Sequence, residues 1–207
     1  MSTQLNQELS NMTIFTPQDS ALLLIDHQVG TIQLVKNISQ EIVKQNAIAL
    51  AKAAKILNMP VVLTSSQETN VQGSLLPELQ EILPTAFAAR VQRAGIVNAW
   101  NDPNFSAAVA ATGKKNLIMA GVTTSVCLVY PALSAIEAGY SVQAVMDASG
   151  SPSELAEEVS RRRMEKAGTI LTATDSIIAE LAQDWSTPTG SQLIQVLFQH
   201  VLPTIAA

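Results

Sequence analysis

The sequence predicts an α/β fold in which helices cover both faces of a six-stranded, mostly parallel sheet. Two observations carry this prediction. Short apolar runs of strand length alternate along the chain with longer segments whose apolar residues recur at helical spacing. Alternation of strand and helix implies right-handed crossovers, and these place helices on the two faces of a parallel sheet.

The strands are expected at residues 21–26, 61–66, 89–93, 116–121, 141–148 and 169–174. The first run, ALLLID, is continuously apolar and stops at an acid, as a buried parallel strand does at its carboxyl end. Residues 37–58 have apolar side chains at helical spacing and stop before Pro60, which predicts a long helix. A short helix is expected over 105–112, closed by Gly113, and helical patterns follow strands four to six.

Length and composition favour one α/β domain spanning all 207 residues. A small-molecule substrate is expected from the strand-end residues described below. Hydrophobic residues make up 47% of the chain and charged residues only 14%, so apolar surface exceeds what one monomer hides and a homo-oligomer is expected. The net charge is −5, and the longest basic cluster, Arg161–Arg163, is interpreted as a solvated helix face. Nucleic-acid binding is therefore not expected.

Two features predict a cytoplasmic protein that does not enter a membrane. The opening segment MSTQLNQELSN lacks the basic start and apolar centre of a signal peptide, and no window of 18 apolar residues predicts a spanning helix. Cys127 is the single cysteine, which suits a reducing compartment.

Three reactive side chains follow expected strands. Asp26 ends the first strand, Arg93 ends the third, and Cys127 lies just past the fourth. Ligands of open α/β sheets bind at the carboxyl ends of strands, so an acid, a cation and a thiol should converge there. On sequence alone, Cys127 remains a small core residue, a reactive thiol or a partner for another chain, while Asp26 could be a turn residue and Arg93 a surface ion-pair partner.

The chemistry of a reactive Cys127 can be stated from its position. A helix that begins near Thr124 or Ser125 would place the thiol in its first turn, where the helix dipole and Arg93 should lower its pKa. Asp26 would accept the thiol proton as general base, and the Cys127 N–H would face the oxygen of an attacked carbonyl. Pro131 lacks an N–H and should make the helix kinked or tight at this point.

Five motifs, in order, resemble the isochorismatase-like cysteine hydrolases, most closely the YcaC-type members: LLLIDHQVG, LTSSQET, VQRAGIVNAWND, AGVTTSVCLVYPALSAIEAGYSV and VMDASG. The resemblance runs from about Thr16 to Trp185. It implies a Rossmann-like three-layer α/β/α sandwich with a core of about 16–185. The C-terminal tail, 186–207, is then expected to make contacts in a tetramer or octamer.

The resemblance also implies a catalytic triad. The family's aspartate falls on Asp26 and its nucleophile on Cys127, while its lysine falls on Arg93, which is a departure because arginine stays charged and cannot relay a proton. A cis peptide bond between Val122 and Thr123 would aim the Thr123 N–H as a second oxyanion donor. The implied reaction hydrolyses a small amide-, carbamate- or imide-like C–N bond through a thioester acyl-enzyme.

Further residues are expected to shape the substrate site, and no cofactor is expected. His27 follows Asp26, and Glu68, Asn98 and Trp100 lie in segments after strands two and three, which predicts a place at the pocket rim. The two histidines, His27 and His200, are too few for a zinc site, so no metal is expected. A redox-sensing thiol and a non-catalytic assembly protein that works through its apolar tail remain alternatives.

Overall fold

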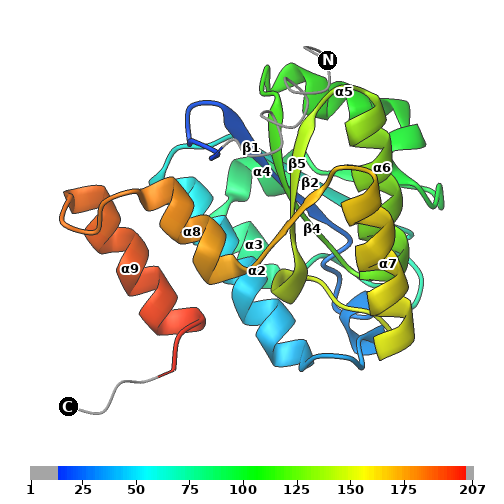
Figure 1. The fold of residues 1–207 in the computed structure, drawn as a ribbon. Helices are drawn as coiled ribbons and strands as arrows, with labels where there is room; N and C mark the ends of the chain where they lie inside the picture. The colour runs from blue at the N-terminus through cyan, green and yellow to red at the C-terminus, as the bar shows by residue number, and fades with distance from the viewer. Residues whose placement is uncertain (1–13, 204–207) are drawn as a thin grey trace.

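The computed structural model describes residues 14–203, so the opening polar segment and the last four residues lie outside the described part (Figure 1). Its centre is a six-stranded sheet in the order β3-β2-β1-β4-β5-β6, and each neighbouring pair is parallel. The strands are β1 (Ser20–Ile25), β2 (Val61–Ser66), β3 (Val91–Arg93), β4 (Asn116–Gly121), β5 (Ser141–Val145) and β6 (Ile170–Thr172). This order is that of a Rossmann-like sheet, which confirms the expected fold class.

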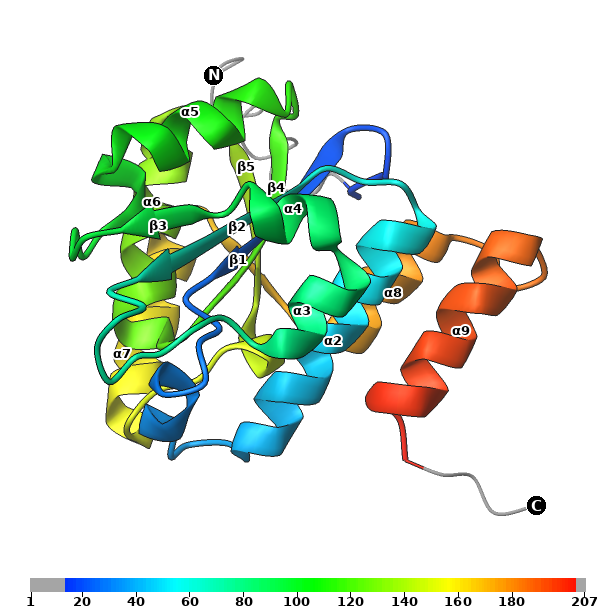
Figure 2. The same cartoon turned by 180° about the vertical axis from the view of Figure 1, so that it is seen from behind.

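Helices cover the sheet on both faces (Figures 1 and 2). One face carries α2 (Gln40–Ile56), α3 (Pro77–Ile82), α4 (Pro84–Ala88), α8 (Thr174–Ala182) and α9 (Pro188–His200), and the other carries α5 (Pro103–Ala111), α6 (Val129–Glu137) and α7 (Glu154–Lys166). Short turns complete the chain: η1 (Thr31–Leu34), η2 (Ala99–Asn101), η3 (Thr124–Leu128) and η4 (Met146–Ala148). The result is a three-layer α/β/α sandwich.

Strand β1 shows why the sheet is central. All six of its residues are buried. Leu22 and Leu24 point into the core beneath α2, α8 and α9, whereas Leu23 points into the core beneath α5, α6 and α7. Because successive side chains of a strand point to opposite faces, only a continuous apolar run fills both cores. Each fully buried leucine stabilises the fold by about 1.5–3 kcal/mol.

The structure shifts some expected boundaries and adds helices. The bounds of β2 and β4 are as predicted, but β3 begins only at Val91 because the Ala89 N–H still bonds to Thr85 at the end of α4. The fifth strand stops at Val145, where the chain turns into η4. Helices α3 and α4 were not predicted. Each is short and begins with a proline, which is preorganised for the first position of a helix.

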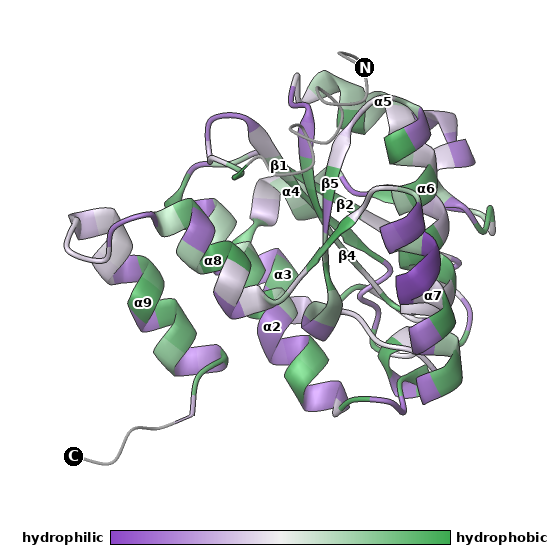
Figure 3. Cartoon of the chain, viewed as in Figure 1, coloured by the Kyte–Doolittle hydropathy of each residue, from purple (hydrophilic) through white to green (hydrophobic). Residues whose placement is uncertain are grey.

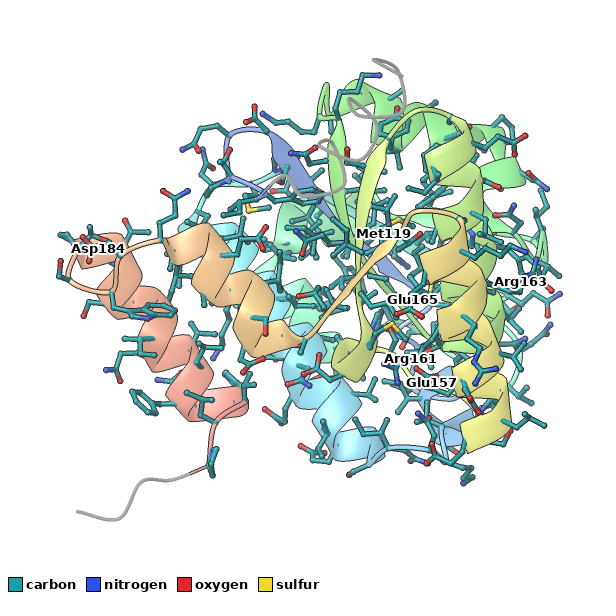
Figure 4. The ribbon with its side chains drawn as sticks, in the orientation of Figure 1. Met119, Glu157, Arg161, Arg163, Glu165 and Asp184 are labelled. Carbon is teal, nitrogen blue, oxygen red and sulfur yellow. The ribbon has the colours of Figure 1, made fainter. Side chains whose placement is uncertain are left out.

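The basic cluster of α7 is a solvated face, as predicted. Arg161–Arg163 are all exposed, and Figure 4 shows Arg163 on the outer side of α7. Arg162 pairs with Glu158 at 2.5 Å, and the Arg163 guanidinium lies 5.3 Å from the centre of the Tyr130 ring. In Figure 3 this helix is mostly purple, the colour of hydrophilic residues. These contacts belong to the helix surface.

The C-terminal helix α9 packs within the chain. Leu193, Val196 and Leu197 are buried in the core that α2 and α8 share. The apolar pattern of the tail is therefore explained largely by the monomer itself. Phe198 of the same helix remains 43% exposed, and Trp185, which precedes the helix, is 38% exposed. Among the described residues, no helix combines the length and apolar character needed to cross a membrane.

Candidate active site

Asp26 directly follows β1 in a left-handed conformation, with a φ of 59°. Its N–H bonds to the Thr64 carbonyl at 2.9 Å, so its backbone still belongs to the sheet while the next residue leaves it. Aspartate tolerates this conformation better than most residues with a side chain. The sequence thus places a buried carboxylate at the edge where parallel strands end.

Arg93 ends β3 and is buried beside Asp26. Its Nη2 contacts both carboxylate oxygens of Asp26. Its Nε donates to Thr64 Oγ1 at 3.1 Å, and its Nη1 donates to the Ile96 carbonyl at 2.7 Å. The three nitrogens of the guanidinium are therefore all committed, which fixes the charge in one place.

Cys127 lies in η3, a π-helical turn between β4 and α6. The turn follows a cis peptide bond between Val122 and Thr123, at the position that the family resemblance implies. The Leu128 N–H reaches back five residues to the Thr123 carbonyl at 3.2 Å. We expected a kinked or tight helix before Pro131, and the chain instead widens into a π turn.

Gly121 shows how closely this turn approaches the sheet. A Cβ at Gly121 would lie 3.2 Å from both the carbonyl carbon and the carbonyl oxygen of Cys127. Such contacts are tighter than ordinary van der Waals packing. A residue without a side chain at the end of β4 therefore lets η3, the turn that contains Cys127, fold back against the strand.

One pocket brings the three predicted reactive residues together. It has a volume of about 340 Å³. Asp26, Arg93 and Cys127 all line it, as does Thr123. The remaining lining residues are Gln28, Thr31, Leu34, Ser66, Gln67, Gln72, Gly95, Ile96, Val97 and Val126. Asp26 and Arg93 come from the ends of two strands and Cys127 from the turn after a third, the edge where the sheet order predicts a ligand site.

The charges in this pocket differ from the expectation for the thiol. Burial raises the pKa of Cys127 well above its ordinary value, and the Asp26 carboxylate raises it further. Arg93 and the Thr123 backbone oppose this increase but have the smaller effect. The predicted low pKa of Cys127 is therefore wrong, because Arg93 contacts Asp26 and burial of the thiol outweighs the cation. Burial likewise raises the pKa of Asp26, against the opposing charge of Arg93.

The backbone N–H of Cys127 was expected to face a substrate carbonyl. In the structure it donates to the Thr123 carbonyl at 2.8 Å. The π turn explains this difference, because the Val126, Cys127 and Leu128 N–H groups all converge on that one oxygen. The Cys127 N–H is therefore not an unoccupied donor.

His27 and Glu68 do not line the pocket that contains Cys127, contrary to the prediction. The His27 ring is completely buried, its Nε2 bonds to the Ala148 carbonyl at 2.8 Å, and burial lowers its pKa to about 4. Glu68 lines a neighbouring surface depression and is held by Arg90, Ser65 and Gln92. His27 thus ties the segment after β1 to η4, and Glu68 joins side chains of β2 and β3.

Asn98 and Trp100 are also absent from the lining. Asn98 accepts from the Trp100 N–H at 3.1 Å and donates to Ser134 Oγ at 2.9 Å, so it caps η2 and ties it to α6. Trp100 packs edge-on against Phe105 and Tyr140, with ring centres 6.3 and 5.4 Å away. Both side chains stabilise the layer of α5 and α6. Leu34, Ile96, Val97 and Val126 provide the apolar wall instead.

Sequence reasoning missed several polar residues of the pocket. Gln28 follows Asp26 by two residues, and Gln67 directly follows β2. Their positions after strand ends were a usable signal, but an uncharged side chain attracts less attention than an acid or a thiol. Thr31 and Gln72 come from η1 and a loop, where the sequence gives no such signal. In the part of the chain that the structure describes, no three His, Cys, Asp or Glu side chains gather to hold a metal ion.

Comparison with known proteins agrees with this geometry. Residues 20–176 match the isochorismatase domain family. The probable hydrolase YcaC of Escherichia coli is 45% identical over 168 residues, which cover 81% of this chain and 79% of that protein.

Two solved structures are similar over almost the whole chain. YcaC from Pseudomonas aeruginosa, solved with hexane-2,5-diol and covalent acrylamide, has a TM-score of 0.86 and 40% identity over 92% of this chain and 93% of its own. The Escherichia coli YcaC gene product, described as an octameric hydrolase of unknown specificity, has a TM-score of 0.87 and 41% identity over 91% of each chain. The chain therefore belongs to the isochorismatase family and is an isochorismatase-like hydrolase.

Proposed function

We propose that this protein is a cysteine-dependent hydrolase of small amide-, carbamate- or imide-like C–N bonds. One observation carries the proposal: Asp26 and Cys127 line one pocket and are close enough for the carboxylate to raise the pKa of the thiol. An acid and a nucleophile coupled in this way, at the bottom of a cavity of about 340 Å³, suit covalent catalysis on a small substrate.

The reaction begins with a protonated thiol, because burial and Asp26 both disfavour the thiolate. As Sγ attacks the substrate carbonyl carbon, the thiol proton passes to the Asp26 carboxylate. Asp26 then returns that proton to the leaving nitrogen as the C–N bond breaks, which leaves a thioester on Cys127. A water molecule attacks the thioester, gives one proton to Asp26, and releases the acid product. The proton on Asp26 then returns to the departing sulfur.

Arg93 acts in this scheme as a fixed charge. Its guanidinium contacts Asp26 and is held by Thr64 and Ile96, so it orients the carboxylate while remaining protonated. A buried carboxylate without a cationic neighbour would tend to stay protonated, and it would then be a poor proton acceptor. Arginine thus supplies the charge of the family's lysine without exchanging a proton.

The oxyanion donor that we propose is the Thr123 N–H. The Thr123 backbone acts on the Cys127 sulfur, where its contact favours the thiolate. A donor at this point lies near any carbonyl that the sulfur attacks. The Cys127 N–H would contribute only by sharing its bond to the Thr123 carbonyl.

The covalent acrylamide in the YcaC of Pseudomonas aeruginosa shows that a similar protein forms a covalent bond to a small amide-bearing compound.

The test is an activity screen with small amides, carbamates and imides, read as ammonia or amine release. The parent should turn over at least one class, and Cys127→Ser should reduce its rate about a thousandfold or more while circular dichroism stays unchanged. Ser125→Ala, a change in the same turn at a residue that does not line the pocket, is the matched control and should keep most of the rate. Equal product release by parent and Cys127→Ser would remove the nucleophile from the scheme.

We further propose that residues 16–185 form the catalytic domain and that the tail, 186–207, contributes contacts in a tetramer or octamer. The exposed Phe198 and Trp185 and the octameric state of the Escherichia coli YcaC structure support this assembly. Light scattering at micromolar concentration should report a multiple of the 22.0 kDa chain mass. A monomer would contradict the proposal, and Phe198→Ser should shift the equilibrium toward smaller species.

A further inference from the structure

Two residues that line the active-site pocket have a side-chain oxygen without a hydrogen-bond partner. These atoms are Gln72 Oε1 and Thr31 Oγ1, and neither has a partner among the described residues. Both oxygens are covered from solvent, so a ligand in the pocket bonds to them when the two side chains turn toward it. A buried polar atom without a partner costs about 1–3 kcal/mol. Two such atoms on residues of one pocket point to a ligand that completes them.

The hydrogen-bond polarity of Gln72 is fixed by its neighbours. The Ala94 carbonyl can only accept, so it takes the Gln67 amide nitrogen as its donor, at 3.3 Å. Gln67 Oε1 therefore faces Gln72 and accepts from Gln72 Nε2 at 3.2 Å. This contact turns the nitrogen of Gln72 toward Gln67 and leaves Oε1 as the unused atom. A ligand at Gln72 must consequently supply an N–H or O–H donor.

The backbone that carries Gln72 is held in place. Gly30 donates to the Gln72 carbonyl at 2.9 Å, and Val29 donates to Ser74 at 3.0 Å. The two segments approach so closely that a Cβ on Gly30 would lie 1.9 Å from the Val71 carbonyl oxygen. Gln28 strengthens the junction, because its side chain binds the Ser66 backbone and the Gly73 carbonyl. The acceptor is therefore presented from a preorganised loop.

The charges of the pocket disfavour an anionic ligand group. Its lining contains two charged residues, Asp26 and Arg93, and these neutralise each other. Each Arg93 nitrogen already has a partner in Asp26, Thr64 or Ile96, so the pocket has no cation without a counter-charge for a carboxylate. A carboxylate beside Gln72 Oε1 would instead bring two acceptors together without a proton between them.

We infer that Gln72 and Thr31 form a specificity subsite that selects uncharged substrates with an N–H donor, such as a carboxamide, over the corresponding carboxylates. The inference deepens the proposed hydrolase function and rests on it. Gln72 Oε1 accepts from the ligand N–H, and the Thr31 hydroxyl bonds to the ligand carbonyl. The aliphatic wall of Leu34, Ile96 and Val97 contacts the rest of the molecule.

The test measures binding to the Cys127→Ser protein, so that no turnover is needed. The probes are butyramide and butyrate, which have the same shape but differ in charge and in the N–H donor, together with valeramide and valerate. Calorimetry near neutral pH should show the amides binding about tenfold or more tighter than the carboxylates, a difference of about 1.4 kcal/mol. In the same Cys127→Ser protein, Gln72→Leu and Thr31→Val should each weaken amide binding about fivefold and reduce the preference for amides over carboxylates.

Gln92→Leu is the matched control, because it makes the same change at an exposed glutamine outside this pocket and should leave binding unchanged. Carboxylates that bind as tightly as the amides, amides that do not bind, or two variants that keep the full preference would each overturn the subsite. Hydrolysis by the parent is scored separately. If amides are cleaved without this preference, only the subsite fails; if the preference holds without cleavage, only the proposed hydrolysis fails.

Discussion

Two acid–arginine pairs lie near the same edge of the sheet, and their comparison separates a structural ion pair from the pair that we propose to be catalytic. Asp26 and Arg93 form the first pair, with side chains 3% and 1% exposed. Glu68 and Arg90 form the second, with side chains 15% and 19% exposed. In the second pair, Arg90 Nε and Nη2 donate to the two oxygens of Glu68 at 2.8 and 3.0 Å. In the first, one nitrogen of Arg93 contacts both oxygens of Asp26.

The pKa values of the two acids move in opposite directions. Hydrogen bonds from Arg90, Ser65 and Gln92 lower the pKa of Glu68 to about 2. Burial outweighs the influence of Arg93 and raises the pKa of Asp26. Glu68 therefore has its charge saturated by donors, while Asp26 is costly to ionise and lies beside a thiol that can give it a proton. The contrast teaches that an arginine neighbour does not by itself decide the pKa of a carboxylate in this fold, because burial outweighs that neighbour at Asp26.

The largest effect on rate should come from removing the carboxylate of Asp26. Asp26→Asn should reduce kcat on any amide substrate about a thousandfold, because an amide of the same shape cannot accept the thiol proton. Glu68→Gln, the matched change in the neighbouring pair, should keep most of the rate. Asp26→Asn should also lower the pKa of Cys127, since a negative charge beside the thiol is lost, and thiolate absorbance against pH measures this change. Similar rates for the two variants would end the distinction between the pairs.

Substitutions of Arg93 and Arg90 should also differ in their effect on the rate, but by less than the substitutions of the two acids. Arg93→Ala should lose most activity, and the acidic limb of the pH–rate profile should move to higher pH, because removal of a cation raises the pKa of Asp26 further. Arg93→Lys should keep partial activity, since lysine supplies the charge without the planar fork. Arg90→Ala is the control and should leave the profile in place. An unchanged profile in Arg93→Ala would leave a dyad of Asp26 and Cys127.

The smallest effect concerns stability at acid pH. The pKa of Glu68 falls from 4.5 to about 2 in the folded protein, so its pair stabilises the fold fully above pH 4.5 and loses this contribution as pH falls toward 2. Urea midpoints measured through this range should fall less steeply for Glu68→Gln than for the parent. Glu158→Gln, in the exposed pair with Arg162, is the control and should alter the midpoint little at any pH. Parallel curves for Glu68→Gln and the parent would show that the pair does not stabilise the fold.

Sequence patterns predicted the sheet and the meeting of Asp26, Arg93 and Cys127 in one pocket, because both depend on local signals. A continuous apolar run such as β1 can only be satisfied between two layers, and the residues after such runs meet at one edge of a parallel sheet. The bounds of β2 and β4 followed directly from this rule. Helices α3 and α4 escaped prediction because each spans too few residues to show a helical period.

The rest of the site depends on contacts between distant segments. Gln72 enters the pocket because its loop pairs with Gly30, more than forty residues earlier, and no local pattern records that pairing. Trp100 and Asn98 follow a strand end, as predicted, but the chain turns them toward Phe105 and Ser134. The pKa of Cys127 was predicted from the helix start and Arg93, whereas burial in the assembled pocket has the largest effect on it.

The close approach of Gly30 to Val71 also limits which positions around the pocket can change. Any side chain at Gly30 would displace the opposite loop, so the junction that carries Gln72 tolerates little variation. Leu34 and Val97 at the entrance are 54% and 59% exposed, and substitutions at such positions usually change stability by less than about 0.5 kcal/mol. New substrate ranges in this lineage, or in a directed-evolution library, should therefore arise from substitutions at Leu34 and Val97, while Gly30 stays unchanged.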